Sequence, residues 1–235
     1  MIPISDINPS KNSPLISRIF IFTTIFIFMF IQPKNTSELF NFFYQFASIP
    51  CELLTLTPLS DSQFYANDCF AAKENIIFLN KNLMFSIVYS NFFHSNLLHI
   101  IGNLWSFWIF GNNIEDKLGK VKFVIFLAVI GIFSIGFHTF LNPSSIVPVV
   151  GASGIVSGLM GAYVYLFPNA RLLVLVPFGI LFPTTIKAKY FMFFWFISQI
   201  AIAFSTQNIS WEAHLGGYLC GYLLLKFLRY KRYKF

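Results

Sequence analysis

The chain has 235 residues, of which 56% are hydrophobic and only 11% are charged. Soluble globular domains carry about 25% charged residues, and a soluble core of this size has no use for 32 phenylalanines. The composition therefore excludes a soluble globular protein. It predicts a multi-pass membrane protein that forms one domain.

The chain begins with a polar stretch that leads into an apolar one. Residues 1–17 include three prolines, which predicts a short mobile cytoplasmic tail. Ile19–Ile31 is strongly apolar behind basic residues, as a signal peptide would be. No cleavage site of small residues follows it, so we expect a retained first transmembrane helix over about residues 15–32.

Residues 33–83 form a long first outer loop. Its aromatic clusters are typical of segments that lie at a membrane interface. Cys51 and Cys69 both lie in this loop. They can form a disulfide only if the loop faces an oxidising compartment, and two free thiols are an equally good interpretation.

Five more apolar segments follow, separated by polar or proline-containing connections. They cover residues 85–110 (with the membrane part starting near His94), 121–141, 151–167, 190–204 and 213–230. We expect a tight polar turn at 111–119, and the connection at 168–189 has an apolar middle. The sequence thus predicts an all-α membrane protein with a six-helix domain over residues 18–230 and a basic cytoplasmic tail at 231–235.

The distribution of basic residues supports this helix count. With the N-terminus inside, six crossings leave only Lys34, Lys73 and Lys81 outside, and the other 13 of the 16 basic residues inside. Such a bias is what the positive-inside rule requires. The net charge of +7 is therefore interpreted as a topology signal, and nucleic-acid binding is not expected.

A serine between glycines, in Gly151-Ala152-Ser153-Gly154, opens the predicted fourth helix. The first N–H groups of a helix have no partner within it, so they can hold a developing oxyanion beside the hydroxyl. Alone the pattern is weak, because small residues at membrane helix starts more often serve close packing.

Other polar residues are expected at the depth of Ser153. With a rise of about 1.5 Å per residue, His99, Ser153 and His214 lie about 18, 21 and 18 Å above the inner ends of their helices. Asn103 lies one turn below His99 on the same face. Polar side chains at membrane depth tend to be functional, although interhelical hydrogen bonds are the alternative explanation.

Two stripes of small residues are expected to bring helices four and six together. The stripes consist of Ser153, Ser157 and Gly161, and of His214, Gly217 and Gly221. This packing would place Ser153 within reach of a neighbouring imidazole, the usual base for a serine nucleophile. Glu212 lies two residues from His214 and points elsewhere on a helix. We therefore predict a Ser–His dyad rather than a triad.

These residues resemble the rhomboid family of intramembrane serine proteases. The resemblance covers His94 to about Arg229 and rests on four motifs: His94-Ser95-Asn96-Leu97-Leu98-His99-Ile100-Ile101-Gly102-Asn103, the turn from Phe110-Gly111 through Glu115 to Gly119, Gly151-Ala152-Ser153-Gly154, and Ala213-His214-Leu215-Gly216-Gly217 with Gly221. It implies that Ser153 is the nucleophile and His214 the general base. It also implies an oxyanion hole built from His99, Asn103 and the Ser153 N–H, which Gly151 approaches closely.

The resemblance further implies six helices, a water-filled cavity open to the outside, and substrates that are transmembrane segments of membrane proteins. The chain departs from the family at two places. Many relatives carry a Trp-Arg pair where this chain has Phe85-Ser86, and some carry a tyrosine under the catalytic histidine where this chain has Ser157.

Several other polar residues receive lesser roles. His94 resembles a family histidine that ties the first loop to helix two, and His138 is expected at the interface. Glu115 is expected to cap the inner turn, and Trp195 and Gln199 lie on helix five, which in this family borders the path of the substrate; lipid or core packing is an equal alternative for both. No two candidate ligands share a spacing used for metals, and no cofactor is expected.

The sequence therefore predicts a serine endopeptidase that cleaves within the membrane. The alternative is a non-catalytic rhomboid-like protein that binds membrane clients, and a small transporter is disfavoured because no acidic residue lies in the predicted spans. We expect a bacterial inner membrane, with an organelle membrane as the alternative. Both termini would be cytoplasmic and the active site would open to the outer face.

Overall fold

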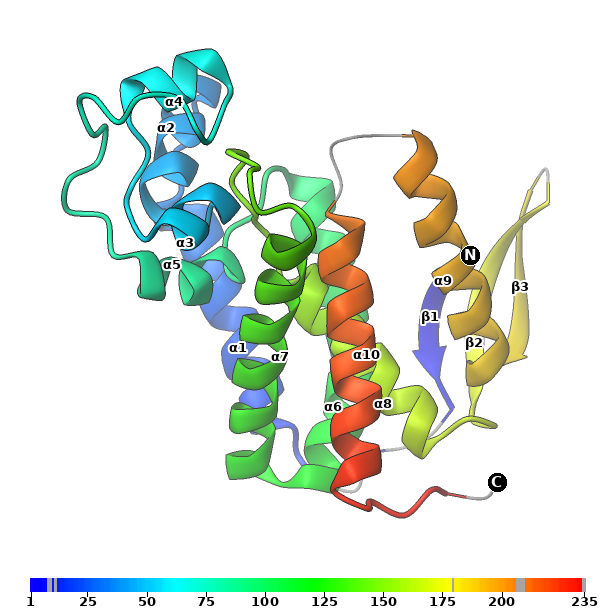
Figure 1. Cartoon of the computed structure of the whole chain (residues 1–235). Coiled ribbons are helices and arrows are strands. Elements are labelled where there is room, and N and C mark those ends of the chain that lie inside the picture. The colour runs from blue at the N-terminus through cyan, green and yellow to red at the C-terminus, as the bar shows by residue number, and fades with distance from the viewer. Residues whose placement is uncertain (8–9, 11, 179, 206–209, 234–235) are drawn as a thin grey trace.

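The computed structural model describes residues 1–7, 10, 12–178, 180–205 and 210–233 (Figure 1). Within them the chain is mainly helical. The helices are α1 (Leu15–Phe26, continued by a π-helical segment, Ile27–Ile31), α2 (Thr36–Phe46), α3 (Pro50–Thr55), α4 (Asp61–Ala66), α5 (Leu83–Ser90), α6 (Leu97–Leu118), α7 (Lys120–Leu141), α8 (Ser153–Leu166), α9 (Ala188–Ser205) and α10 (Trp211–Phe227). The strands are β1 (Ile2–Asp6), β2 (Arg171–Phe178) and β3 (Ile180–Lys187).

Six of these helices lie where the sequence predicts membrane segments: α1 with its π-helical extension, α6, α7, α8, α9 and α10. Among the described residues, only α7 is by itself both long and apolar enough to cross a membrane. Leu15–Ile31 and α8 are apolar but shorter. The helical bundle is thus observed, whereas crossing by all six helices remains a prediction.

A three-stranded antiparallel sheet makes the prediction of an all-α fold incomplete. β1 pairs with β2, and β2 pairs with β3. The first strand comes from residues expected to be a mobile tail, and the hairpin comes from the connection at 168–189. Leu172 and Val174 are buried and alternate with more exposed neighbours, which is the two-residue period of a half-buried strand.

The inner end of α6 also differs from the prediction. The helix continues to Leu118 through the expected turn at 111–119, and the chain reverses only at Gly119, whose φ is +73°. The polar residues of this segment have partners on other elements. The Glu115 carboxylate accepts hydrogen bonds from the Ile16 and Ser17 backbone N–H groups (2.9 and 2.8 Å). Glu115 therefore caps α1, not the inner turn.

Helices α8 and α10 pack backbone to backbone, as predicted. A methyl group added at Gly217 would lie 2.1 Å from the Gly154 carbonyl oxygen, and one at Gly221 would lie 1.9 Å from that of Gly158. The stripe on α8 is thus Gly154, Gly158 and Gly161 and not the face of Ser153 and Ser157. The predicted pair of helices is correct, but the face of α8 that contacts α10 begins one residue later than predicted, at Gly154 and Gly158.

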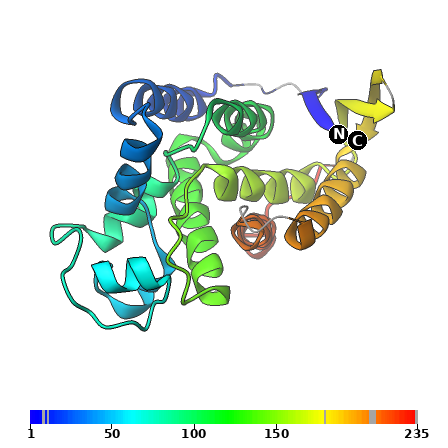
Figure 2. The same cartoon turned by 90° about the horizontal axis from the view of Figure 1, so that it is seen from above.

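The segment predicted to be the first outer loop is a folded subdomain beside α7, on the opposite side of the molecule from α9 (Figures 1 and 2). Helices α2, α3 and α4 enclose a small separate core that includes Tyr44, Ile49 and Leu59. Cys51 and Cys69 form a disulfide with a Cα–Cα distance of 5.6 Å, which decides between the two interpretations of these cysteines. The loop therefore has a fixed structure of its own.

Candidate active site

The backbone before Ser153 brings three predicted site residues together. Gly151 has a φ of +121°, which side chains other than glycine rarely adopt. A Cβ at Gly151 would lie 2.8 Å from two atoms of the His99 ring and 3.5 Å from Asn103 Nδ2. The chain can pass so close to His99 and Asn103 only because residue 151 has no side chain. Ser153 follows two residues later and begins α8.

Asn103 and His99 both direct donor groups toward this loop. Asn103 is buried, and its Nδ2 has no hydrogen-bond partner in the described part of the chain. The Ser95 hydroxyl lies 3.1 Å from His99 Nδ1, and the same hydroxyl accepts from Asn96 Nδ2. If Ser95 donates its proton to Nδ1, the His99 proton is on Nε2, the nitrogen nearest Gly151. The site then contains two side-chain donors beside the start of α8.

His94 holds the same loop from the other side. Its Nε2 accepts from the Ala152 N–H (3.4 Å), and its Nδ1 lies 3.2 Å from the Phe92 carbonyl oxygen, to which it donates. The Gly151 N–H in turn donates to the Ser90 carbonyl oxygen at 2.9 Å. A structural role for His94 is therefore supported, although the ring contacts the loop before Ser153 directly.

His214 lies on α10, in contact with α9. Its Nδ1 is 2.6 Å from Gln199 Oε1, and the Trp195 ring is centred 6.3 Å from its own ring. Glu212 Oε2 instead lies 3.1 Å from His138 Nδ1, so the prediction that Glu212 points away from His214 is confirmed. Within the described part of the chain, no hydrogen bond joins the Ser153 hydroxyl to His214.

The structure adds two residues that the sequence did not assign to the site. Ser95 stands four residues before His99, a helical spacing that could have indicated the contact. Gln199 was expected only along the substrate path, because nothing in the sequence shows which way α9 faces. Ser157, in the place of the family tyrosine, donates its hydroxyl to the Ser153 carbonyl oxygen (2.7 Å).

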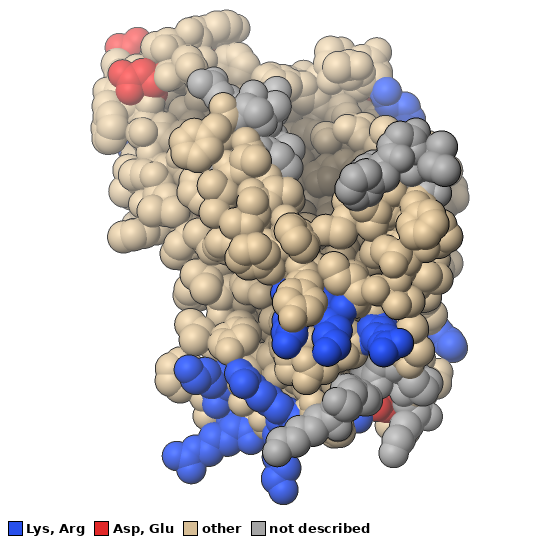
Figure 3. All heavy atoms as spheres, turned by 90° about the vertical axis from the view of Figure 1, so that its right-hand side faces the viewer, with Lys and Arg blue, Asp and Glu red and all other residues tan. Residues whose placement is uncertain are grey.

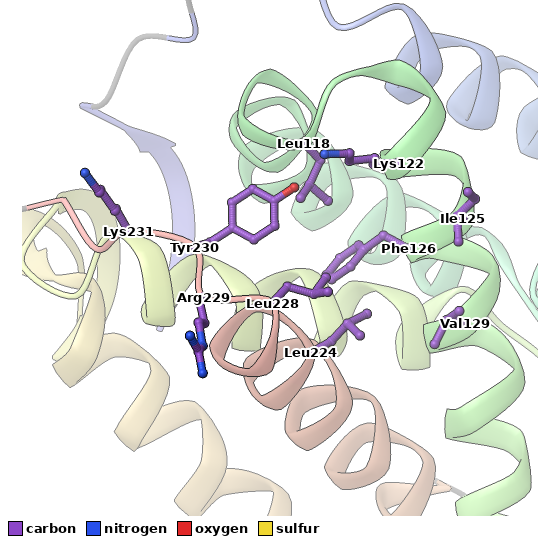
Figure 4. Close-up of a pocket in the computed structure, with 10 residues that line it drawn as sticks. All are labelled: Leu118, Lys122, Ile125, Phe126, Val129, Leu224, Leu228, Arg229, Tyr230 and Lys231. Atoms are coloured by element: carbon purple, nitrogen blue, oxygen red, sulfur yellow. The ribbon is translucent and has the colours of Figure 1, made fainter.

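A cavity of about 610 Å³ lies at the opposite end of α10 from His214 (Figure 4). The residues that line it include the apolar side chains of Phe126, Leu224 and Leu228, together with Lys122. The side chains of Arg229 and Lys231 diverge from one another in this view. This cavity is therefore separate from the residues around Ser153.

Comparisons with known proteins agree with these motifs. A family model described as Rhomboid domain matches residues 81–231. Rhomboid protein 1, mitochondrial, of Saccharomyces cerevisiae is 28% identical over 169 residues, which cover 66% of this chain and 46% of that protein. The putative rhomboid protease YdcA of Bacillus subtilis is 31% identical over 145 residues, which cover 57% of this chain and 62% of that protein.

The putative rhomboid protein L523 of Acanthamoeba polyphaga mimivirus is 29% identical over 136 residues, which cover 56% of this chain and 68% of that protein. This chain thus spans about half to two thirds of the length of these relatives. The matched segment extends over more than half of the chain and contains every candidate site residue from His99 to His214. The protein therefore belongs to the rhomboid family, whose members are integral to membranes.

Proposed function

We propose that this protein is an intramembrane serine endopeptidase in which Ser153 is the nucleophile and His214 the general base. One observation carries the proposal. The positive-φ backbone at Gly151 lies against His99 and against Asn103 Nδ2, which has no partner among the described residues, beside the N-terminus of α8 where Ser153 stands. Buried donors without partners are costly, and an oxyanion is the ligand that such a set of donors accommodates.

The reaction follows from these groups. His214 Nε2 takes the hydroxyl proton as Ser153 Oγ attacks the carbonyl carbon of the scissile bond. The oxyanion is held by Asn103 Nδ2, His99 Nε2 and the Ser153 N–H. His214 then gives its proton to the leaving amine, and water hydrolyses the acyl-enzyme by the same route.

The contact between α8 and α10 supports a pairing of Ser153 with His214, because their chain neighbours Gly154 and Ala213 face one another: a Cβ at Gly154 would lie 3.7 Å from the Ala213 carbonyl oxygen. Within the residues that the structure describes, no hydrogen bond joins the two side chains, which is compatible with the proposal. Catalytic hydrogen bonds are often long before the substrate binds and tighten only in the complex.

Membrane placement is part of the proposal. Six crossing helices put both termini in the cytoplasm and the start of α8 toward the opposite face, where substrate transmembrane segments would reach it. Lys and Arg gather at the end of the molecule where α10 ends (Figure 3), which fits the positive-inside rule. The disulfide in the first outer loop fits an oxidising outer compartment. The relatives point to a membrane of bacterial or mitochondrial type.

Co-reconstitution with a tagged single-pass substrate in liposomes tests the function. Wild type should cleave the substrate, and Ser153→Ala and His214→Ala should not. Ser157→Ala is the matched control, because Ser157 is the next hydroxyl on α8 and has no proposed role in the chemistry. A fluorophosphonate probe, which labels activated serines, should label wild type but not Ser153→Ala.

Because the fluorophosphonate reacts with the serine itself, labelling tests the activation of Ser153 without a choice of protein substrate. Cleavage or labelling that survives Ser153→Ala would overturn the mechanism. A wild type that neither cleaves several substrates nor reacts with the probe would favour the non-catalytic, client-binding alternative.

A further inference from the structure

The imidazole of His214 can act as a base toward Ser153 only in one tautomer. One ring nitrogen must carry the proton and face away from the serine, so that the other keeps its lone pair. The hydrogen bond made by the first nitrogen decides which tautomer is present. In a serine protease with a triad, an aspartate makes this bond.

No carboxylate makes this bond in the described part of the chain. Glu212 is the nearest acidic residue in the sequence, and its carboxylate binds His138 Nδ1 on α7. The partner of His214 Nδ1 is instead Gln199 Oε1 at 2.6 Å. An amide oxygen only accepts hydrogen bonds, so this contact requires a proton on Nδ1, and the neutral ring then keeps its lone pair on Nε2.

The Gln199 side chain is held against His214 by its helix. Trp195 lies one turn before Gln199 on α9, and its ring contacts the His214 ring as well as that of Tyr218, which is stacked at a centroid distance of 6.0 Å. Both contacts come from a helix at the edge of the bundle beside α10 (Figure 2). His214 is therefore oriented from α9 and not by its own helix.

We infer that Gln199 is a positioning residue for His214, and that it does with a neutral amide what the aspartate does in a triad. The inference rests on the proposed function. The base keeps its reactive tautomer only while α9 stays against α10, so the placement of α9 becomes part of the catalytic geometry. An amide also adds no negative charge to an apolar bundle, where a buried carboxylate would be costly.

Three variants test this role in liposomes with the same tagged substrate. Gln199→Met keeps the length of the side chain but removes the acceptor. Gln199→Glu keeps an acceptor and adds a charge. Ser198→Ala is the matched control, because Ser198 is exposed on α9 and its hydroxyl donates to the Trp195 carbonyl oxygen of its own helix.

Gln199→Met should lower kcat by at least about tenfold with little change in KM, and Ser198→Ala should leave both unchanged. Gln199→Glu should retain most of kcat. Its carboxylate favours the protonated imidazole, so the acid limb of its pH–rate profile should lie at higher pH than that of wild type. The other titratable groups around His214 are His99 on α6 and the His138–Glu212 pair, and none of these variants alters them.

A wild-type rate in Gln199→Met, with Ser153→Ala inactive, would overturn the positioning role and leave the proposed function standing. Equal losses in Gln199→Met and Gln199→Glu, without a shift in the pH profile, would overturn it too, because they would indicate a purely structural role. A wild type that neither cleaves nor reacts with the fluorophosphonate would overturn the proposed function and this inference together.

Discussion

Asn103 is buried, and its amide nitrogen lacks a partner among the residues that the structure describes. Such a donor costs about 1–3 kcal/mol of stability. If the nitrogen binds the oxyanion, removing it should increase stability and lower activity. Asn103→Leu should keep or raise the thermal midpoint in detergent while kcat falls by about 10²–10³. A loss of midpoint together with an unchanged rate would show that Asn103 is needed for packing and not for the reaction.

Gly151 is a second residue whose substitution tests the predicted oxyanion hole. In Gly151→Ala the new methyl group would lie 2.8 Å from the His99 ring at a φ of +121°, so the loop must move away from the donors. We expect kcat to fall by about 10²–10³, as for the loss of an oxyanion donor. Gly102→Ala is the control, since a Cβ there meets nothing within 4 Å, and it should cleave at the wild-type rate. Equal rates for the two variants would contradict the close approach.

At the scale of elements, the sequence predicted the helices better than their ends. Apolar runs locate α6 to α10, since long hydrophobic segments have few alternatives in a membrane. The end of α6 was missed because Glu115 looks like a residue of a polar turn until α1 is placed beside it. The pairing of α8 with α10 could be predicted from their glycines. Which face of α8 packs on α10 depends on backbone contacts that the spacing of small residues alone does not determine. For the same reason Gln199 could be named but not paired with His214.

Strand β1 was not predicted, because its anchor is formed by residues distant in the sequence. Asp6 Oδ2 accepts from Asn113 Nδ2 on α6 (2.7 Å) and from the Tyr163 hydroxyl on α8 (3.0 Å). Five residues with a proline have little intrinsic preference for a strand. Their pairing with β2 and this anchor fix the segment in place.

Asp6 should make the stability of this anchor depend on pH. Burial raises the pKa of Asp6 from 3.8 to about 6, although the bonds from Tyr163 and Asn113 oppose the shift. A pKa raised by folding contributes stability that is complete below the unfolded value and is lost as the pH rises through about 6. Asp6→Asn does not titrate, so its thermal midpoint relative to wild type should be higher at about pH 7.5 than at about pH 5. The same difference at both pH values would show that Asp6 does not change charge in this range.

In the whole molecule, the distribution of basic residues and the structure of the first outer loop support the same orientation in the membrane. The loop holds a disulfide, a separate core and a buried ion pair between Glu52 and Lys81 (2.6 Å). Burial raises the pKa of the Glu52 carboxyl and lowers that of the Lys81 amine, and their mutual attraction opposes both shifts. The folded, disulfide-linked loop lies at one end and the basic surface at the other, which agrees with the prediction that the loop is outside and the basic residues are inside.

This orientation predicts the number of reactive thiols in the intact protein. Cys51 and Cys69 are bridged and Cys220 is free, and a bridge persists only on the oxidising side of a membrane. Protein isolated from cells in the presence of maleimide and then denatured should carry a single label, at Cys220, whereas reduction before labelling should expose all three cysteines. Cys220→Ser is the matched control and should carry no label before reduction. Labels at Cys51 and Cys69 without reduction would place the loop in a reducing compartment, and the start of α8 would then face the cytoplasm.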